Sequence, residues 1–206
     1  MEYSGKYKII GLTGCIGSGK STVGRLLESM GFRRVDADEL SRSVMNRNLD
    51  LINQLVDEFG PSVINNSGSL DRRALAQIVF SSDLALKRLE DIVHPVIEKE
   101  ALIQLGNGPW PVVFEVPLLF QTKQDRHTDL TVVVKSPVDL RMQRVIVRDS
   151  SDEASFNARN SRQNSEDWLL ERCDVVILNQ GSLDDLTNRV RRFADDLISD
   201  SIAGIY

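Results

Sequence analysis

Short apolar runs alternate with amphipathic stretches along most of this chain. Five runs bounded by glycine or polar residues predict buried strands, at residues 7–13, 32–38, 111–120, 129–136 and 174–179. Between them, apolar residues at three- and four-residue spacing predict helices, at residues 20–30, 137–148 and 182–198. This alternation predicts an α/β fold in which helices cover both faces of a parallel sheet.

Residues 39–104 show a different pattern, because nearly the whole stretch has helical periodicity. A polar loop at 60–71 interrupts it, and Pro95 is expected to kink or break the last helix, since proline lacks an N–H group. We therefore expect a helical insertion at about 39–109, beside one end of the sheet.

The core of this single domain is then expected to comprise about residues 6–38 and 110–206. A polar stretch at about 149–165 contains arginines and has too little apolar surface to pack by itself, so we expect a mobile lid with some helix. Ligands of parallel sheets bind beyond the carboxyl ends of the strands. The predicted site lies there.

Composition narrows the classes of partner. The 206 residues carry a net charge of −5, which does not attract nucleic acid or anionic lipid at long range. No apolar run approaches a membrane span, and the N-terminus lacks the apolar region of a signal peptide. Cys15 and Cys173 form no disulfide framework and fit a reducing compartment. We expect a cytoplasmic monomer or small homo-oligomer with small-molecule partners, and neither nucleic acid nor membrane.

A complete phosphate-binding loop follows the first predicted strand and precedes a predicted helix. Its pattern is Gly14-x4-Gly19-Lys20-Ser21, in which glycines let backbone N–H groups turn toward phosphates. Lys20 is placed to reach the β- and γ-phosphates, and the Ser21 hydroxyl to bind Mg²⁺. The sequence predicts that ATP is held by Gly14, Cys15, Ile16, Gly17, Ser18, Gly19, Lys20, Ser21 and Thr22.

Cys15 is an unusual side chain inside such a loop. One interpretation is that it only fills space. The other is that surrounding N–H groups acidify its thiol and leave it open to oxidation.

Two aspartates follow the second predicted strand, in "VDADELSR". We expect the end of that strand to lie beside the first strand, so a carboxylate there can approach the γ-phosphate. Asp38 suits a base that takes the proton of an acceptor hydroxyl, and Asp36 suits metal support through water. The alternative is that one of them caps a helix that begins at Glu39. Neither a guanine-reading Asn-Lys-x-Asp nor a motor-type aspartate after strand 111–120 is present, which weakens regulatory and motor functions.

Arginines supply the positive charge that phosphoryl transfer needs. Arg141, Arg144 and Arg148 have three- and four-residue spacing and so share one helix face. The alternatives are a solvated basic face or a role on the transferred phosphate, with Arg159 and Arg162 closing over it from the lid.

Taken together, these motifs resemble dephospho-CoA kinases over about residues 8–198. The resemblance rests on segments that occur in the family's order: "GLTGCIGSGKSTV", "VDAD", "GSLDRRALAQIVF", "IVHPVI", "VPLLF", "VVVKSPVDLRMQRVIVRD", "ARNSRQ" and "VVILNQGSLDDL". It implies ATP- and Mg²⁺-dependent phosphorylation of the ribose 3′-hydroxyl of dephospho-CoA, the last step of coenzyme A synthesis. It also implies a nucleoside-monophosphate-kinase-like core, a helical acceptor-binding domain and a lid.

The resemblance assigns roles to individual residues. Asp38 matches the family's proposed base, and Arg144 an arginine expected near the phosphates. Arg72 and His94 are expected near the acceptor, although His94 precedes Pro95 and has the alternative role of bonding to freed backbone. We further expect Arg148 to contact ATP and Arg159 to contact the acceptor.

The chain departs from the family at four positions. It has Cys15 where glycine is common, Gln121 where an acid is common, and Glu115 and Leu178 where aspartate is frequent. The rival hypotheses are another small-molecule kinase, disfavoured by the long helical block, and a non-catalytic nucleotide-binding protein, which would not need Asp38.

Overall fold

The computed structural model describes residues 5–65 and 67–206. The chain forms two compact units. The first contains the residues up to Asp36 together with Asn107–Tyr206, and the second contains Ala37–Gly106.

The first unit is built on a five-stranded parallel sheet, as the alternating pattern predicts. Its strands are β1 (Ile9–Thr13), β2 (Arg33–Asp36), β3 (Val112–Glu115), β4 (Leu130–Lys135) and β5 (Val175–Leu178). Their order is β2-β3-β1-β4-β5. The expectation that β2 lies beside β1 is therefore wrong, because β3 pairs between them. Strands that follow each other in sequence are neighbours only as a tendency, and a whole helical unit separates β2 from β3.

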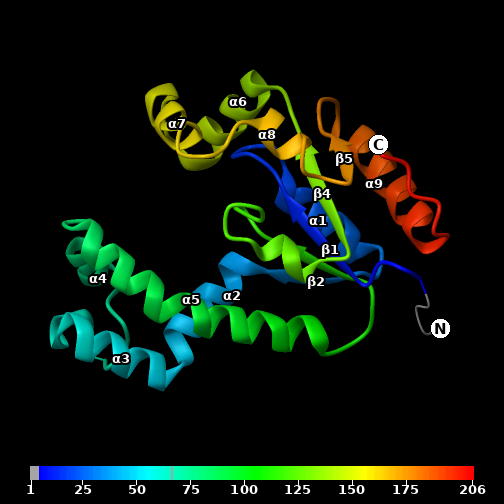
Figure 1. Ribbon diagram of the computed structural model, residues 1–206. Helices are drawn as coiled ribbons and strands as arrows, with labels where there is room; N and C mark the ends of the chain where they lie inside the picture. The colour runs from blue at the N-terminus through cyan, green and yellow to red at the C-terminus, as the bar shows by residue number, and fades with distance from the viewer. Residues whose placement is uncertain (1–4, 66) are drawn as a thin grey trace. The chain divides into compact units, whose positions relative to one another are not determined.

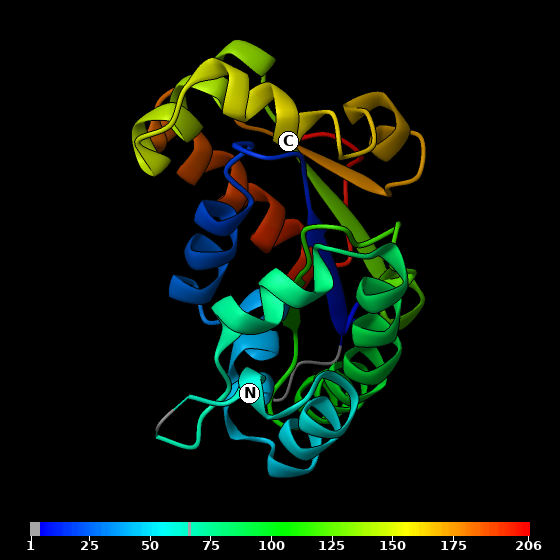
Figure 2. The ribbon, with the colours of Figure 1, turned by 90° about the vertical axis from the view of Figure 1, so that its left-hand side faces the viewer.

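Helices cover both faces of this sheet. α1 (Lys20–Ser29) and α9 (Leu183–Ile198) lie side by side on one face (Figures 1 and 2). There they bury an apolar core with the alternate β4 residues Val132 and Val134. Val133 points the other way and packs with Leu169 of α8 (Glu166–Leu170), since successive strand residues face opposite sides of a sheet.

The end of the sheet at which the strands terminate carries further helices. Figure 1 shows α6 (Val138–Asp149), α7 (Glu153–Asn160) and α8 gathered at the carboxyl end of β4. The 3₁₀ helix η2 (Gln124–His127) precedes β4. The lid segment was expected to lack an apolar anchor, but Phe156 of α7 is almost fully buried. The buried Phe156 side chain thus anchors this otherwise polar segment to the rest of the unit.

The second unit is helical, as its periodicity predicts. It contains α2 (Ala37–Arg47), α3 (Leu49–Phe59), the 3₁₀ helix η1 (Pro61–Val63), α4 (Arg72–Val79) and α5 (Asp83–Gly106). α5 packs against α2, α3 and α4. The Asp71 side chain starts α4 by accepting hydrogen bonds from the N–H groups of Arg73 and Ala74.

α5 continues through Pro95, so the predicted alternative of a broken helix is wrong. Proline removes one backbone hydrogen bond, at a cost of about 3 kcal/mol in a helix interior. Val93, Ala101 and Leu105 are buried along the same helix, so packing holds both halves in place. Tertiary contacts outweigh the local preference here.

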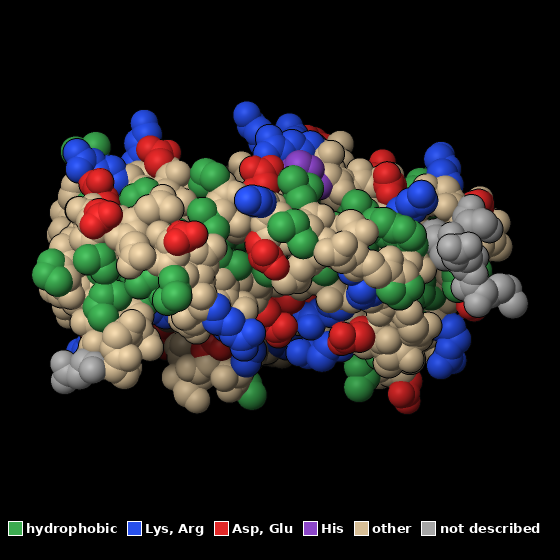
Figure 3. Space-filling view, turned by 90° about the horizontal axis from the view of Figure 1, so that it is seen from below, with side chains coloured by type: hydrophobic (Ala, Val, Ile, Leu, Met, Phe, Trp, Pro, Cys, Tyr) green, Lys and Arg blue, Asp and Glu red, His purple; other side chains and the backbone are tan. Residues whose placement is uncertain are grey.

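Charged side chains of both signs are interspersed with hydrophobic ones on the face shown in Figure 3. Within residues 5–65 and 67–206, no helix has both the length and the apolar character that crossing a bilayer requires.

Candidate active site

The phosphate-binding loop lies in the first unit, between β1 and α1, as predicted. It ends at Gly19, whose φ of 93° is left-handed and precedes the first turn of α1. This conformation ends the loop at the helix N-terminus, where backbone N–H groups and the helix dipole favour an anion.

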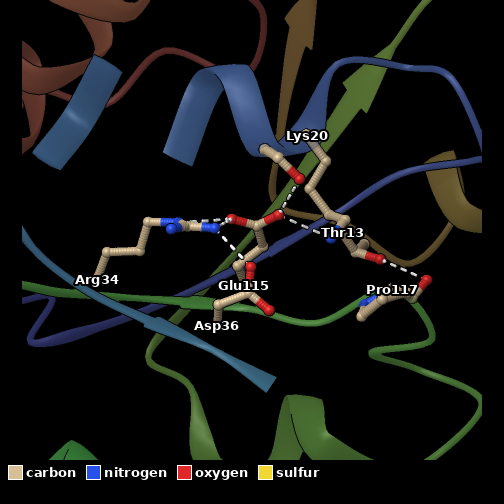
Figure 4. A network of polar contacts seen from close by, with 7 residues as sticks. Thr13, Lys20, Arg34, Asp36, Glu115 and Pro117 are labelled. Carbon is tan, nitrogen blue, oxygen red and sulfur yellow. Dashed lines mark hydrogen bonds and ion pairs between the residues drawn. The ribbon is translucent and has the colours of Figure 1, made fainter. Parts of the chain in front are cut away.

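Lys20 points to one buried carboxylate, Glu115 (Figure 4), and the Ser21 hydroxyl contacts the same carboxylate. Lys20 Nζ lies 2.9 Å from Glu115 Oε1, and the Ser21 hydroxyl donates to the same oxygen at 2.5 Å. Glu115 is the last residue of β3 and is 0% exposed. Because β3 pairs directly with β1, the sheet delivers this carboxylate to the start of α1.

Arg34 completes the network from β2. Its Nε and Nη2 atoms each lie 2.7 Å from Glu115 Oε2, and Nη2 lies 2.5 Å from Asp36 Oδ2. Two cations and two carboxylates therefore alternate across the carboxyl ends of β2 and β3 (Figure 4). Gly24 of α1 makes room for this packing, because a Cβ there would lie 2.6 Å from Glu115 Oε2.

Glu115 is held in its charged form. Burial alone raises the pKa of this carboxyl. The charge of Lys20 and the hydrogen bonds from Ser21, Lys20 and Arg34 outweigh burial, so its pKa lies below the usual value. The carboxylate can therefore accept from the Lys20 ammonium and the Ser21 hydroxyl at neutral pH.

The donor set at Ser21 fits Mg²⁺. Mg²⁺ keeps several waters and binds to kinases through few protein oxygens together with substrate phosphates. Ser21 offers a hydroxyl oxygen, and Glu115 stands behind it as the acceptor that orients the hydroxyl. Among the described residues, no group of three or more His, Cys, Asp or Glu side chains could hold a metal alone. The Asp36 carboxylate is engaged in an ion pair with Arg34.

Arg141 and Arg144 reach the loop from α6. Arg141 is 5% exposed and donates to the carbonyls of Ser136, at 3.1 Å, and Ile16, at 3.3 Å. The alternative of a solvated basic face is therefore wrong for Arg141, because its guanidinium is buried and donates to protein acceptors. Arg144 donates to Ser136 Oγ at 2.9 Å and to Asn179 Oδ1 at 3.2 Å, which places it beside the same loop.

Arg148 and Arg159 meet at one acid. Both pair with Asp149, at 2.7 Å from Arg148 Nε to Oδ1 and 2.5 Å from Arg159 Nη1 to Oδ2. Hydrogen bonds from the two arginines hold the Asp149 pKa well below its usual range. Arg162 is exposed on the same segment. The structure thus brings the predicted Arg148 and Arg159 together at Asp149, the last residue of α6.

The segment 149–165 also contacts the loop directly. Gln163 Oε1 accepts from the Ile16 N–H at 2.7 Å, and Asn160 Oδ1 accepts from Arg141 at 2.9 Å. Gln163 therefore contacts the first half of the loop directly, whereas Asn160 is linked to it only through Arg141 of α6.

Cys15 fills space, and the hypothesis of an acidic, exposed thiol is wrong. The residue is 5% exposed and packs with Val133 and Leu169. Burial raises the pKa of its thiol, which outweighs the lowering effect of Arg141. A protonated, covered thiol is a poor nucleophile.

We therefore expect Cys15 to react with iodoacetamide at least about 100-fold more slowly in the native protein than in urea. Peptide mapping by mass spectrometry at successive times would separate Cys15 from Cys173. Rapid native alkylation of Cys15 that ATP prevents would contradict this expectation.

The remaining predicted residues belong to the second unit. α2 begins at Ala37, so Asp38 lies in its first turn and does not cap a helix that starts at Glu39. The Asp38 side chain is exposed. Arg72 donates to the Arg42 carbonyl at 2.8 Å, and His94 is exposed on α5.

Sequence reasoning missed three residues around the loop. Glu115 was treated only as a departure from a family pattern, although a lone acid that ends a fully apolar strand is a readable signal. Gln163 and Asn179 lie in the predicted lid and at the end of the last predicted strand, but their chemistry depends on contacts across the fold.

Comparisons with known proteins agree with the geometry. A family model for dephospho-CoA kinase matches residues 8–185. A dephospho-CoA kinase from Corynebacterium glutamicum is 39% identical over 181 residues, covering 86% of this chain and 93% of that protein. A crystal structure from Thermus thermophilus is 36% identical with a TM-score of 0.78, covering 92% of this chain and 97% of that one. A dephospho-CoA kinase from Campylobacter jejuni shares the fold, with a TM-score of 0.74, 24% identity and coverage of 95% and 99%.

Proposed function

The chain belongs to the dephospho-CoA kinase family, and we propose that it transfers the γ-phosphoryl group of ATP to the ribose 3′-hydroxyl of dephospho-CoA. The products are coenzyme A and ADP, in the last step of coenzyme A synthesis. The observation that carries this proposal is the phosphate-binding loop whose Lys20 and Ser21 converge on the buried Glu115.

On the donor side, the loop binds the triphosphate through backbone N–H groups and Lys20. In the structure Lys20 rests on Glu115, 2.9 Å away, so its ammonium is already positioned beside the helix N-terminus. We propose that Lys20 and Arg144 stabilise the charge that develops on the transferred group, and that Arg148 contacts ATP. Ser21, with water-mediated support from Asp36, would hold Mg²⁺, which would supply further neutralisation of phosphate charge.

On the acceptor side, Asp38 acts as the base. The 3′-oxygen forms a bond to the γ-phosphorus, the bond from that phosphorus to the β,γ-bridging oxygen breaks, and the hydroxyl proton passes to the Asp38 carboxylate. An exposed carboxylate in the first turn of α2 is accessible to an incoming hydroxyl. Arg72, His94 and Arg159 are proposed to bind the acceptor.

These roles suggest how the parts of the chain divide the work of binding the two substrates. We propose that the second unit binds the acceptor and that residues 149–165 form a lid over the donor. Two free cysteines fit the reducing cytoplasm, where we place the reaction. We propose a monomer or small homo-oligomer, with ATP and dephospho-CoA as its small-molecule partners.

A coupled ADP-release assay with ATP and Mg²⁺ tests the proposal against a panel of dephospho-CoA, AMP and adenosine. We expect ADP release to depend on dephospho-CoA, and product mass spectrometry to show the added phosphate on coenzyme A. Equal release with every acceptor, or with none, would refute the proposed acceptor.

Lys20→Ala is the matched loss-of-function variant for this assay. We expect kcat/KM for ATP to fall about 100-fold or more, as when one preorganised transition-state charge is removed. Thermal unfolding of the same sample separates this loss from misfolding. Unchanged steady-state kinetics would refute the assignment of the loop.

A further inference from the structure

Three successive carbonyls of the phosphate-binding loop are held by side chains from outside it. Arg141 donates to the Ile16 carbonyl at 3.3 Å and Arg144 to the Gly17 carbonyl at 3.4 Å. Asn179, in the connection between β5 and α9, donates from Nδ2 to the Ser18 carbonyl at 2.7 Å. This third bond is the shortest, and both of its partners are buried.

We propose that Asn179 is a positioning residue of the triphosphate cradle. The peptide between Ser18 and Gly19 is planar and trans, so a Ser18 carbonyl that points to Asn179 turns the Gly19 N–H in the opposite direction. Asn179 thus orients this N–H, immediately before α1, through the Ser18 carbonyl. Orienting a donor before the ligand arrives lowers the entropic cost of binding.

The same amide also connects the loop to Arg144. Asn179 Oδ1 accepts from Arg144 Nη2 at 3.2 Å, and the Asn179 carbonyl accepts from the same nitrogen at 3.4 Å. The Asn179 N–H donates to the Lys135 carbonyl at 2.8 Å, which fixes the residue to the end of β4. One buried side chain therefore sets both the loop and an arginine proposed to meet the phosphates.

The two contacts of the Asn179 side chain require both an amide group and a side chain of this length. A donor must face the Ser18 carbonyl and an acceptor must face Arg144, and among side chains of this length only asparagine offers both. Gly19 leaves the space for it, because a Cβ on Gly19 would overlap Asn179 Nδ2. Aspartate keeps the acceptor for Arg144 but sets a carboxylate oxygen against the Ser18 carbonyl.

The test compares Asn179→Asp, Asn179→Ala and the control Gln180→Ala, whose side chain is exposed next in the chain. Binding of ATP, inorganic tripolyphosphate and adenosine is measured for each full-length variant, with tripolyphosphate and adenosine read as competitors of a fluorescent ATP analogue. We expect both Asn179 variants to lose about tenfold or more in affinity for ATP and tripolyphosphate. The reason is that the Gly19 N–H is no longer held toward the phosphates, and an N–H bonded to a phosphate is a charge-assisted hydrogen bond. Affinity for adenosine, and all three affinities of Gln180→Ala, should stay unchanged.

Steady-state kinetics give the second measurement. KM for ATP should rise in both Asn179 variants while KM for dephospho-CoA stays constant, a split that general destabilisation would not produce. If Asn179→Ala fails to fold, Asn179→Asp carries the test, because it preserves volume. Wild-type affinity of Asn179→Asp for tripolyphosphate, or a loss confined to adenosine, would overturn the proposal.

This inference rests on the proposed function in one respect only, namely that ATP is the phosphoryl donor. Loss of tripolyphosphate affinity in the variants supports the positioning role whichever acceptor the enzyme uses. A wild-type protein that binds neither ATP nor tripolyphosphate would overturn both proposals. A wild type that binds both but does not phosphorylate dephospho-CoA would overturn the proposed acceptor alone.

Discussion

Replacement of Asp38 by asparagine is expected to lower kcat by about 100- to 10,000-fold, the range that loss of a positioned general base produces. Asparagine keeps the size of the side chain but cannot take the acceptor proton. Affinity for ATP should change little, because the phosphate-binding loop and Lys20 belong to the first unit and Asp38 to the second. Steady-state turnover and calorimetric ATP binding on the same sample would measure the two effects separately.

Glu39→Gln is the matched control for Asp38→Asn. Glu39 is exposed in the same first turn of α2, and the substitution changes the net charge by the same amount. We expect this variant to keep turnover within about twofold, since surface changes have small effects. Near-normal turnover of Asp38→Asn, or an equal loss in Glu39→Gln, would remove the base assignment.

Replacement of Glu115 by alanine is expected to lower the free energy of unfolding by about 3 kcal/mol or more. The carboxylate is fully buried and pairs with Lys20 and Arg34, whose side chains are 14% and 10% exposed. Removing it leaves two poorly hydrated cations without a main acceptor, although Arg34 keeps Asp36. Activity should fall as well, because the anchors of Lys20 and the Ser21 hydroxyl are lost together. Urea unfolding and steady-state kinetics would measure both losses.

The variants Glu115→Asp and Glu115→Gln separate the contribution of the charge of Glu115 to stability from that of its shape. Aspartate keeps the charge, so we expect the smallest destabilisation, about 1 kcal/mol from lost packing. Glutamine keeps the shape but lacks the charge, so it should approach the alanine variant. Equal stability of Glu115→Gln and the parent protein would show that the ion pairs contribute nothing.

The difference in the free energy of unfolding between the parent protein and Glu115→Gln should depend on pH in a defined direction. The pKa of Glu115 is lowered in the folded state, so its stabilisation is fully present above the ordinary carboxylate pKa of about 4.3. It is lost as pH falls toward the depressed folded value. The stability difference between the parent and Glu115→Gln should therefore be constant near neutral pH and shrink below about pH 4.

Much of the fold was predictable because its determinants are local. The apolar runs at β1, β4 and β5 are bounded by turn residues, and each forms a strand close to its predicted range. The helical periodicity of 39–104 likewise corresponds to a helical unit. Pro95 shows the limit of such reasoning, since its local penalty was correctly read but packing along α5 outweighs it.

The order of the strands was not predictable in the same way. Strand pairing depends on which apolar faces meet across the sheet, and no local pattern records that β3 lies between β2 and β1. This pairing decides the site, because it sets Glu115 beside Lys20 and Ser21 and moves Asp36 one strand further from the loop.

Sequence motifs alone identify the phosphate-binding loop, since Gly14, Gly19, Lys20 and Ser21 act through backbone geometry at a fixed spacing. Motifs in a fixed order likewise identify the family. The surroundings of that loop, in contrast, depend on the tertiary structure. Residues about 95 and 160 positions away, Glu115 and Asn179, contact it, and Cys15 is buried against Val133 and Leu169. Burial and long-range hydrogen bonds arise only when the sheet and its helices pack, so no local stretch contains them.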